Sequence, residues 1–556
     1  MNAFTFSFTC TLSPHHKTLL SPNYRTHSSH TSPKSITRSS LSKQHNKPLK
    51  KSLLEPSFLE VILNKCDDFI DTFIDPPRHP SVNPECVLSN NFAPVNELPP
   101  TECEVVKGFL PPCLDGAYIR NGPNPQYLPR GPFHLFDGDG MLHSTRISKG
   151  KVIFCSRYVK TYKYLIEKKA GFSFIPNLFS DFNSLISLVS HGAMFITRKT
   201  LGQFDPSNGI GVANTSLALI GGNLFALCES DLPYAIKLAP NGDIITIGRH
   251  DFDENLSTNM TAHPKTDPET GEAFAFRYGP IYPFLTYFRI YPNGTKSRDI
   301  PIFSLTRPTF IHDFAITKNY AIFPDIQVGM NPFGLITGGA PVGPNLRKVP
   351  RLGVIPRYAM DELEMKWFEV SGFNMMHAIN AWEEDDGDTI VVIATNAISV
   401  EHFLKRLDLI HASIEKVKID LKTGYTRRNP VSTRNLELAS INMAYVGKAK
   451  GVAKLDLSIS ETDQRDCIVA TRIFGPNCFC SEPFFVAKDS NNVSTADEDD
   501  GYVMCYMHNE NTRESSLMVM DAKSHDLDIV AVVKLPRRVP YGFHGAFVKE
   551  SDLNML

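Results

Sequence analysis

Two segments of the chain carry apolar residues at the spacing of an amphipathic helix. In the first, over residues 57–74, apolar side chains recur at offsets 0, 3, 4, 7, 10, 11 and 14 from Leu59. The dipeptide Pro76-Pro77 follows and ends the helical pattern. The second segment, over residues 175–190, repeats the same offsets from Ile175. Because this spacing matches a period of 3.6 residues, we predict one helix in each segment.

After residue 190 the pattern changes to short runs of β-branched and aromatic residues. Examples are residues 244–247, 389–393 and 529–533, and turn dipeptides such as Asn241-Gly242 and Asp500-Gly501 lie between such runs. Many short strands predict an all-β fold, closed or radially repeated so that few sheet edges are exposed. No clean sequence repeat is visible, so the pattern alone leaves a propeller as one possibility.

Composition and charge exclude several classes of protein. The chain has 556 residues, of which 42% are hydrophobic and 21% charged, values typical of globular proteins. A formal net charge of -2 is not the signature of a nucleic-acid-binding protein. No run of 18 apolar residues occurs, so we expect no transmembrane helix. The 11 cysteines lack zinc-site or disulfide spacing, which fits a reducing compartment.

The N-terminal segment differs from the rest of the chain. Residues 1–54 contain no acidic residue, 18 Ser or Thr and 8 Lys or Arg. This composition is typical of an organellar transit peptide, and the Ser/Thr content favours a plastid over a mitochondrion. We therefore predict a disordered plastid transit peptide over residues 1–54 and a folded body over 55–556. An ordinary disordered tail is the alternative.

Histidines are the best candidates for the chemistry of the body. His312, His377 and His544 each lie inside an apolar, strand-like run. A single buried histidine is more often a core residue with satisfied hydrogen bonds, but three in similar settings favour a shared metal ion. The body has 13 histidines, and these patterns alone do not identify which of them converge.

Six short motifs resemble those of the carotenoid cleavage dioxygenases. They include Phe310-Ile311-His312-Asp313-Phe314 and Pro540-Tyr541-Gly542-Phe543-His544-Gly545, together with residues 260–272, 374–383, 118–125 and 136–141. Residues 348–353 and 536–540 are similar to the plant plastid subfamily numbered four. The resemblance extends from residue 57 to the last residue.

That resemblance implies a seven-bladed β-propeller with an α-helical cap over an axial metal site. It also implies Fe(II) as the cofactor, with His263, His312, His377 and His544 as the ligands. Glu229, Glu437 and Glu482 are the corresponding carboxylates that would accept the outer imidazole N–H groups. Four neutral imidazoles leave the charge of the ion uncompensated and two octahedral positions open for substrate and O2.

The family substrates are long apolar polyenes, so the resemblance implies an apolar tunnel and a lipid-docking surface. The expected tunnel residues are Phe136, Met376, Leu438 and Phe543. The expected membrane patch, on the two predicted helices, consists of Phe58, Ile62, Phe69, Phe73, Leu178, Phe179, Phe182, Leu185 and Ile186. It would make peripheral contact with a plastid membrane or plastoglobule surface. The polar face of the first helix is mainly acidic, unlike most membrane-surface helices, so helices that only cover their own domain remain an alternative.

We therefore expect an iron-dependent dioxygenase that cleaves a double bond of a carotenoid or apocarotenoid with O2 into two carbonyl products. Two departures from the family favour an alternative. The chain lacks a strand-length segment after Gly447, and Cys478-Phe479-Cys480 replaces a glycine pair before Glu482. The alternative is a catalytically impaired carotenoid-binding protein of plastid lipid bodies. A third hypothesis is a propeller that serves as an interaction module without metal.

Overall fold

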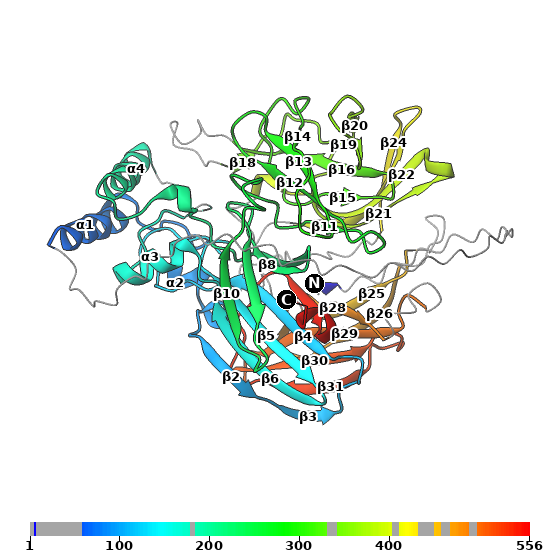
Figure 1. Ribbon diagram of the computed structural model, residues 1–556, viewed down its shortest axis with the longest axis horizontal. Coiled ribbons are helices and arrows are strands. Elements are labelled where there is room, and N and C mark those ends of the chain that lie inside the picture. Colours follow the sequence, from blue (N-terminus) through cyan, green and yellow to red (C-terminus); the bar gives the residue numbers. More distant parts are fainter. Residues whose placement is uncertain are drawn as a thin grey trace, which may run out of the picture.

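The computed structural model describes residues 5–6, 58–177, 179, 184–330, 342–402, 411–431, 450–457, 467–488 and 497–555. Most of the predicted transit peptide lies outside these ranges, as do Leu178, Phe182, Glu437, Leu438 and Gly447. The described part of the chain is mostly β-structure with few helices (Figure 1).

Strands that follow one another in the sequence usually pair antiparallel, which produces a series of separate sheets. One sheet consists of β7 (Ser216–Ile220), β8 (Asn223–Leu227), β9 (Tyr234–Leu238) and β10 (Ile244–Arg249). The next consists of β11 (Lys265–Thr266), β12 (Ala273–Tyr278), β13 (Leu285–Ile290) and β14 (Ile300–Pro301). A third contains β15 (Ala315–Ile316), β16 (Tyr320–Asp325), β19 (Arg351–Pro356) and β20 (Lys366–Glu369).

The series continues with β21 (Met375–Glu384), β22 (Thr389–Ala397), β23 (Ala412–Asp420) and β24 (Thr426–Pro430). A smaller sheet joins β25 (Gly451–Leu455) to β26 (Ile468–Ile473), and β1 (Thr5–Phe6) pairs with β25 in parallel. The two strands β17 (Val328–Met330) and β18 (Val342–Pro344) form a separate ribbon.

Two further sheets bring together strands from opposite ends of the described chain. One contains β2 (Leu98–Glu102), β6 (Lys151–Tyr158), β5 (Gly140–Ser148), β4 (Gly116–Pro123) and β32 (Gly545–Lys549). The other contains β27 (Cys478–Cys480), β28 (Phe484–Ala487), β29 (Gly501–Asn509), β30 (Glu514–Asp521), β31 (Ile529–Lys534) and β3 (Glu104–Gly108). Because β32 pairs with β4 from Gly545 opposite Arg120, the backbone just before β32 is held firmly.

The largest cluster of core residues is rich in aromatic side chains and lies between neighbouring sheets. Phe276, Phe314 and Phe323 have no exposed surface. The rings of Phe314 and Phe323 stack at 5.3 Å, and Phe276 meets Phe314 edge-on at 5.2 Å. Such packed rings contribute large apolar burial together with specific geometry. They lie on or beside the strands that flank His312, so they make the surroundings of that residue rigid.

The described helices lie mainly in two places, before β2 and between β6 and β7. α1 (Phe58–Phe69) and the π-helix η1 (Ile70–Ile74) occupy the first segment for which the apolar spacing predicts a helix. The remaining helices are α2 (Pro84–Val87), α3 (Tyr162–Ala170), α4 (Leu185–Thr200) and α5 (Glu550–Leu553), with short 3-10 turns η2 (Asn90–Phe92), η3 (Pro206–Asn208), η5 (Asp385–Gly387) and η6 (Val400–His402).

The prediction of a second helix over 175–190 was wrong in its position. Residues 175–177 are not helical, and α4 begins at Leu185. The physical reason is the cap: the Ser184 hydroxyl accepts a hydrogen bond from the Ser187 N–H, which satisfies a free donor of the first turn. Apolar spacing alone does not reveal this start.

Charged residues join α4 to α1 and η1, and Figure 1 shows α1 and α4 side by side at one edge of the β-structure. Arg198 of α4 donates to Asp67 and to Asn64. His191 Nε2 lies 3.2 Å from Asp75 Oδ2 and 3.9 Å from Asp71 Oδ1. Among the described helices, none is long and apolar enough to cross a membrane.

Most described members of the expected membrane patch are exposed. Phe58 is 82% exposed, Phe73 70% and Ile186 68%, and Ile62, Phe69 and Leu185 are exposed as well. Phe179 is an exception and corrects the prediction. Because Phe179 precedes α4, it is not on the face of that helix. Its ring packs edge-on against Phe136 at 5.6 Å, and both rings pack against the largest core cluster.

Candidate metal centre

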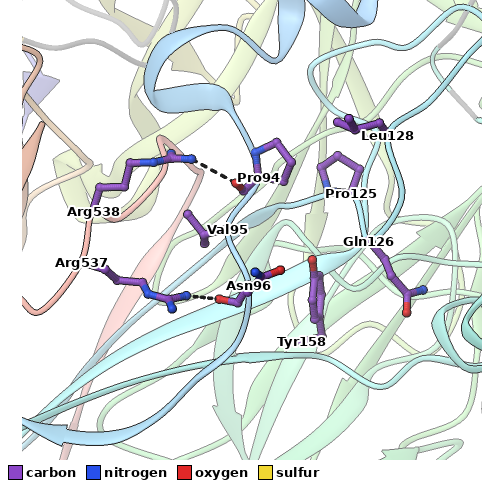
Figure 2. A pocket seen from close by; sticks show the side chains of 9 residues that line it. All are labelled: Pro94, Val95, Asn96, Pro125, Gln126, Leu128, Tyr158, Arg537 and Arg538. Carbon is purple, nitrogen blue, oxygen red and sulfur yellow. Dashed lines mark hydrogen bonds between the residues drawn. The ribbon is translucent and has the colours of Figure 1, made fainter.

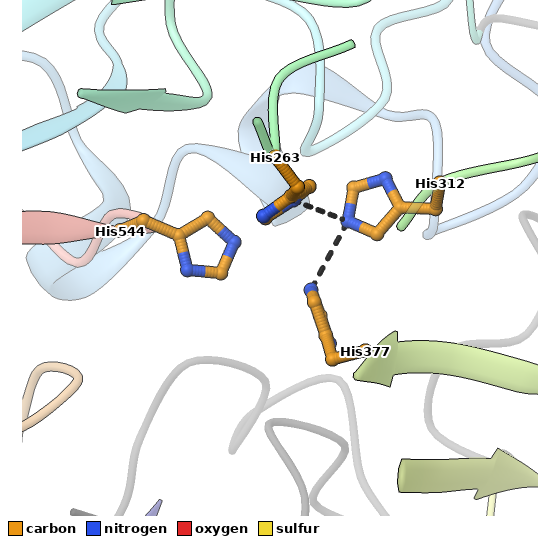
Figure 3. Close-up of side chains that lie close together, drawn as sticks. All are labelled: His263, His312, His377 and His544. Carbon is orange, nitrogen blue, oxygen red and sulfur yellow. Dashed lines mark hydrogen bonds between the residues drawn. The ribbon is translucent and has the colours of Figure 1, made fainter. Parts of the chain in front are cut away.

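Four histidines from four separate segments meet at one point (Figure 3). His263 lies between β10 and β11, His312 between β14 and β15, His377 on β21, and His544 immediately before β32. One ring nitrogen from each lies within 4.8 Å of the others. All four are partly buried, and they are the four residues for which the family motifs imply metal binding.

The distances between the ring nitrogens fit a bound cation. His263 Nε2 lies 3.1 Å from His312 Nε2, and His312 Nε2 lies 3.0 Å from His377 Nε2. Two ligands at right angles, each about 2.1 Å from a metal ion, are about 3.0 Å apart. The inward nitrogens therefore have the separation that neighbouring ligands of one ion require.

Carboxylates fix the outer nitrogen of two of the rings. His312 Nδ1 bonds Glu229 Oε1, and His544 Nδ1 lies 3.0 Å from Glu482 Oε1. The second oxygen of Glu482 accepts the Gly545 N–H at 3.1 Å. A carboxylate at Nδ1 favours the tautomer with its proton there, which leaves the Nε2 lone pair directed inward. Glu437, the third expected carboxylate, is outside the described residues.

The electrostatics of the site favour a neutral imidazole at His263. Burial lowers the pKa of His263 well below its ordinary value, and the positive charges that the other three histidines can carry lower it further. Burial would raise the pKa of Glu482, but His544 and the hydrogen bonds from its ring and from the Gly545 N–H lower it overall. His263 thus favours its uncharged form and Glu482 its ionised form, the states that a metal-binding imidazole and the carboxylate behind one require.

Backbone contacts set the direction of each histidine. The Thr261 hydroxyl accepts from the His263 N–H and the Thr395 hydroxyl from the His377 N–H, each at 3.0 Å. Before His544, a Cβ added at Gly542 would lie 2.9 Å from the Asn121 carbonyl oxygen. Only glycine therefore allows this segment to approach β4 so closely.

Two further residues support the imidazoles: Tyr278, which lies outside the family motifs, and Asp313, which lies inside the motif around His312 but was assigned no role there. The Tyr278 hydroxyl donates to Glu229 Oε2, on the far side of the carboxylate from His312. Asp313, which is 2% exposed, accepts the Ala378 N–H at 2.8 Å and lies 2.7 Å from Lys265 Nζ. Asp313 therefore joins the three segments that carry His263, His312 and His377. In the sequence, Asp313 is distinguished only as a carboxylate within the apolar run of the His312 motif.

Two of the expected tunnel residues, Met376 and Phe543, directly precede ligand histidines in the sequence, and Phe136 packs against Phe543. The rings of Phe136 and Phe543 pack edge-on at 5.6 Å, and Phe543 precedes His544. Met376 precedes His377 and packs, like Phe136, against the largest core cluster. Leu438 is outside the described residues. The ring of Phe136 thus connects Phe543 to Phe179, which it meets edge-on at 5.6 Å.

The chain has close relatives among the plant carotenoid oxygenases. Its residues 92–549 match the family model described as retinal pigment epithelial membrane protein. It is 60% identical over 521 residues to a probable carotenoid cleavage dioxygenase 4 of Arabidopsis thaliana, chloroplastic, covering 90% of this chain and 87% of that protein. It is 54% identical over 514 residues to a chloroplastic 9-cis-epoxycarotenoid dioxygenase of Oryza sativa subsp. japonica, covering 88% and 80%.

Solved structures agree with this assignment. A cobalt-substituted Synechocystis ACO is 26% identical with a TM-score of 0.66, covering 84% of this chain and 99% of that one. A lignostilbene dioxygenase of Pseudomonas brassicacearum, at 23% identity and a TM-score of 0.67, shares the fold over 85% of this chain and 99% of its own. The chain therefore belongs to the family of the carotenoid cleavage dioxygenases and the retinal pigment epithelial membrane protein.

Proposed function

We propose that this protein is an iron(II)-dependent dioxygenase that cleaves a conjugated double bond of a carotenoid or apocarotenoid. The observation that carries the proposal is the convergence of four imidazole nitrogens, from His263, His312, His377 and His544, within 4.8 Å. Four neutral nitrogen ligands suit a first-row transition metal. When bound, iron(II) would supply the redox-active centre that activates O2.

The protein's own residues orient the ligands and keep their protons in place. Glu229 and Glu482 hold the Nδ1 protons of His312 and His544, so both rings present a lone pair inward. Because no carboxylate belongs to the inner set, the ligands do not neutralise the charge of the ion. We further propose that Glu437 acts on His377 in the same way.

The apolar side chains next to the site fit a polyene substrate. Phe136, Met376 and Phe543 offer no hydrogen-bonding side-chain group, so they exclude water and contact a hydrocarbon chain along its faces. We propose that they and Leu438 line the substrate tunnel. Several relatives are named for carotenoid substrates, including a zeaxanthin 7,8(7',8')-cleavage dioxygenase of Crocus sativus that is 50% identical over 369 residues.

The overall reaction balances without another reductant. One C=C bond is broken, one O2 is consumed, and each former alkene carbon gains one oxygen atom as a carbonyl group. Labelled oxygen gas should therefore appear in both products, which are two aldehydes or an aldehyde and a ketone.

We also propose a seven-bladed propeller whose helices cover the site, and a plastid location. Apart from the ribbon of β17 and β18, the described strands form seven sheets, which supports the propeller. Contact of Phe179 with Phe136 links the segment before α4 to the site. The composition of residues 1–54 and the chloroplastic relatives support the plastid, and the exposed side chains of α1 and α4 support docking on a membrane or plastoglobule surface.

The test is anaerobic iron loading of the chain that lacks residues 1–54, followed by O2 and a panel of carotenoids. We expect carbonyl products only when both iron and O2 are present. His312→Ala should abolish both iron retention and cleavage. The matched control is His250→Ala, which removes a partly buried histidine that packs against Phe225 and Phe252 outside the site.

Intact carotenoid in every sample, with iron retained, would contradict the proposal. If the polyene were bound but not cleaved, the carotenoid-binding alternative would be correct. If neither iron nor carotenoid were bound, and His312→Ala changed only stability, the interaction module would be the better explanation.

A further inference from the structure

One cavity of the described chain is lined by two adjacent arginines and by none of the four histidines of the metal centre (Figure 2). Its volume is about 360 Å³, enough for a small molecule. Arg537 and Arg538 supply the charge, and Pro94, Val95, Asn96, Pro125, Gln126, Leu128 and Tyr158 complete the lining. None of these nine residues is acidic.

Hydrogen bonds to neutral oxygen atoms hold both guanidinium groups in place. Arg537 donates to the Asn96 carbonyl. Arg538 donates to the Pro94 carbonyl at 3.0 Å and to Asn91 Oδ1 at 3.2 Å. A guanidinium group has five N–H donors, so each keeps donors that no described residue accepts. The two side chains are thus positioned but not saturated.

Within the described part of the chain, no acidic side chain forms an ion pair with either arginine. The nearby carboxylates of Glu97 and Asp139 accept the backbone N–H groups of Tyr158 and Gln126 instead, and neither lines the cavity. Burial lowers the pKa of Arg538 below its ordinary value, and the positive charge of Arg537 lowers it further. Two half-buried charges without a counter-charge cost free energy, which a bound anion would relieve.

We propose that this cavity is a binding site for a small organic oxyanion, a phosphate or carboxylate group attached to a short apolar chain. Arginine suits this role because its planar fork matches the geometry of an oxyanion. The apolar part would contact Pro94, Pro125 and Leu128. The hydroxyl oxygen of Tyr158 accepts a hydrogen bond from Asn124 Nδ2, so the hydroxyl proton remains available. Tyr158 therefore provides a further donor.

The test measures binding of inorganic phosphate and of hexyl phosphate to the full chain by calorimetry, with chloride at equal ionic strength as the reference. We expect both phosphates to bind, with hexyl phosphate the tighter because its chain reaches the apolar wall. Asn96→Asp places a carboxylate beside Arg537 without removing any guanidinium hydrogen bond, since the backbone carbonyl of residue 96 is the acceptor. We expect this variant to bind both about tenfold or more weakly.

The matched control is Arg298→Gln, which removes an exposed arginine elsewhere on the surface and should leave phosphate binding unchanged. Arg538→Gln should also weaken binding; if it fails to fold, Asn96→Asp still decides the question, because it keeps every native contact of the arginines. The proposal is overturned if wild type binds phosphate no better than chloride. It is also overturned if Asn96→Asp and Arg298→Gln bind phosphate equally well.

Discussion

At the residue scale, the imidazoles depend on a second row of side chains that do not face the centre of the site. One oxygen of Glu229 accepts a hydrogen bond from the ring N–H of His312, and the other accepts one from the Tyr278 hydroxyl. Glu482 divides its two oxygens between the His544 ring and a backbone N–H. Each carboxylate is therefore held at both ends, which fixes the direction of its histidine.

Tyr278→Phe should lower metal affinity about tenfold, since Glu229 then loses the donor that orients it. It should also lower the free energy of unfolding by about 1 kcal/mol, the usual value of a lost hydrogen bond. The control is Tyr287→Phe, which removes a buried hydroxyl that donates to the Arg357 carbonyl far along the chain. Titration with cobalt(II), followed by its absorption spectrum, measures affinity independently of catalysis. Equal affinities in the two variants would contradict the positioning role.

Asp313→Ala should have a larger effect on both quantities. The carboxylate is buried and paired with Lys265, so its removal leaves a cation without a partner and should cost about 3 kcal/mol. It also releases the Ala378 N–H next to His377. We expect metal affinity to fall 10–100-fold, with a smaller loss for Asp313→Asn. Chemical unfolding and metal titration test this, and unchanged affinity in Asp313→Ala would show that the bridge is not needed.

The family motifs pointed to the four histidines and to Glu229 and Glu482, but not to Tyr278 or to the bridging role of Asp313. The ligands stand in distinctive motifs, such as the one around His312, and those motifs identify the family. Tyr278 had no comparable signal, because a tyrosine at the end of an aromatic strand is normally a core residue. Its role depends on a pairing with Glu229, 49 residues earlier, and such contacts follow from how sheets are placed in space.

At the element scale, the junction of α1, η1 and α4 carries more negative charge than it can pair. Asp71 lies in this junction, where burial first, and then the charges of Asp67 and Asp75, raise its pKa to about 6 despite the attraction of His191. In the unfolded chain the value is 3.8. The folded protein therefore binds this proton more tightly, and the stability that Asp71 contributes falls as the pH rises through about 6.

Asp71→Asn should accordingly stabilise the protein at pH 7.5 by about 1 to 2 kcal/mol. The difference from wild type should shrink as the pH is lowered to 5, because Asp71 is then mostly protonated and resembles asparagine. Urea unfolding of both proteins across this pH range measures the difference. A difference that stays constant with pH would mean that Asp71 titrates normally.

The exposed apolar faces of α1 and α4 give a prediction of their own. Replacing Phe73 and Ile186 by serine should weaken association with vesicles of plastid lipids by about a hundredfold or more, since each side chain loses roughly 1.5–3 kcal/mol of apolar burial. Ile281→Ser is the control, because Ile281 is 81% exposed but lies between β12 and β13, away from these helices. Flotation of vesicles with bound protein measures the effect. Equal flotation of all variants would favour helices that only cover their own domain.

Apolar periodicity predicted the first helix but misplaced the second. In the first segment the stripe and the following prolines agree, and α1 with η1 fills it. In the second, the same spacing continued backwards to Ile175 and Phe179, two described residues that pack into or against the core. Phe179 contributes to the stripe and yet packs on Phe136. Periodicity records which residues are apolar, but it does not distinguish a membrane-facing side from a core-facing one.

At the scale of the whole molecule, the four rings come from segments that belong to different sheets. A bound ion therefore connects sheets that otherwise meet through side-chain packing. Ligand binding to the folded state alone adds about 2.7 kcal/mol when the ligand is present at 100 times its Kd. We expect a chelator to lower the thermal midpoint of the wild type and to leave that of His312→Ala unchanged. Identical shifts in both proteins would show that the chelator acts elsewhere.

The all-β character was predictable from short runs and turn dipeptides, whereas the order of the sheets was not. Without the family motifs, nothing in residues 545–549 indicates that they pair with residues 116–120. The same holds for β3, which joins β31. Pairings over more than 400 residues follow from closure of the whole structure, and local patterns contain no information about them.

The pairing of β32 with β4 also determines when the site can exist during biosynthesis. β4 leaves the ribosome early. Its partner strand β32 and the preceding His544 emerge later than His263, His312 and His377. Until then only three imidazoles are available, and one edge of β4 has no neighbour. The complete four-histidine site thus exists only in a polypeptide whose synthesis has passed this strand, so a chain that ended before His544 would offer three of these imidazoles at most.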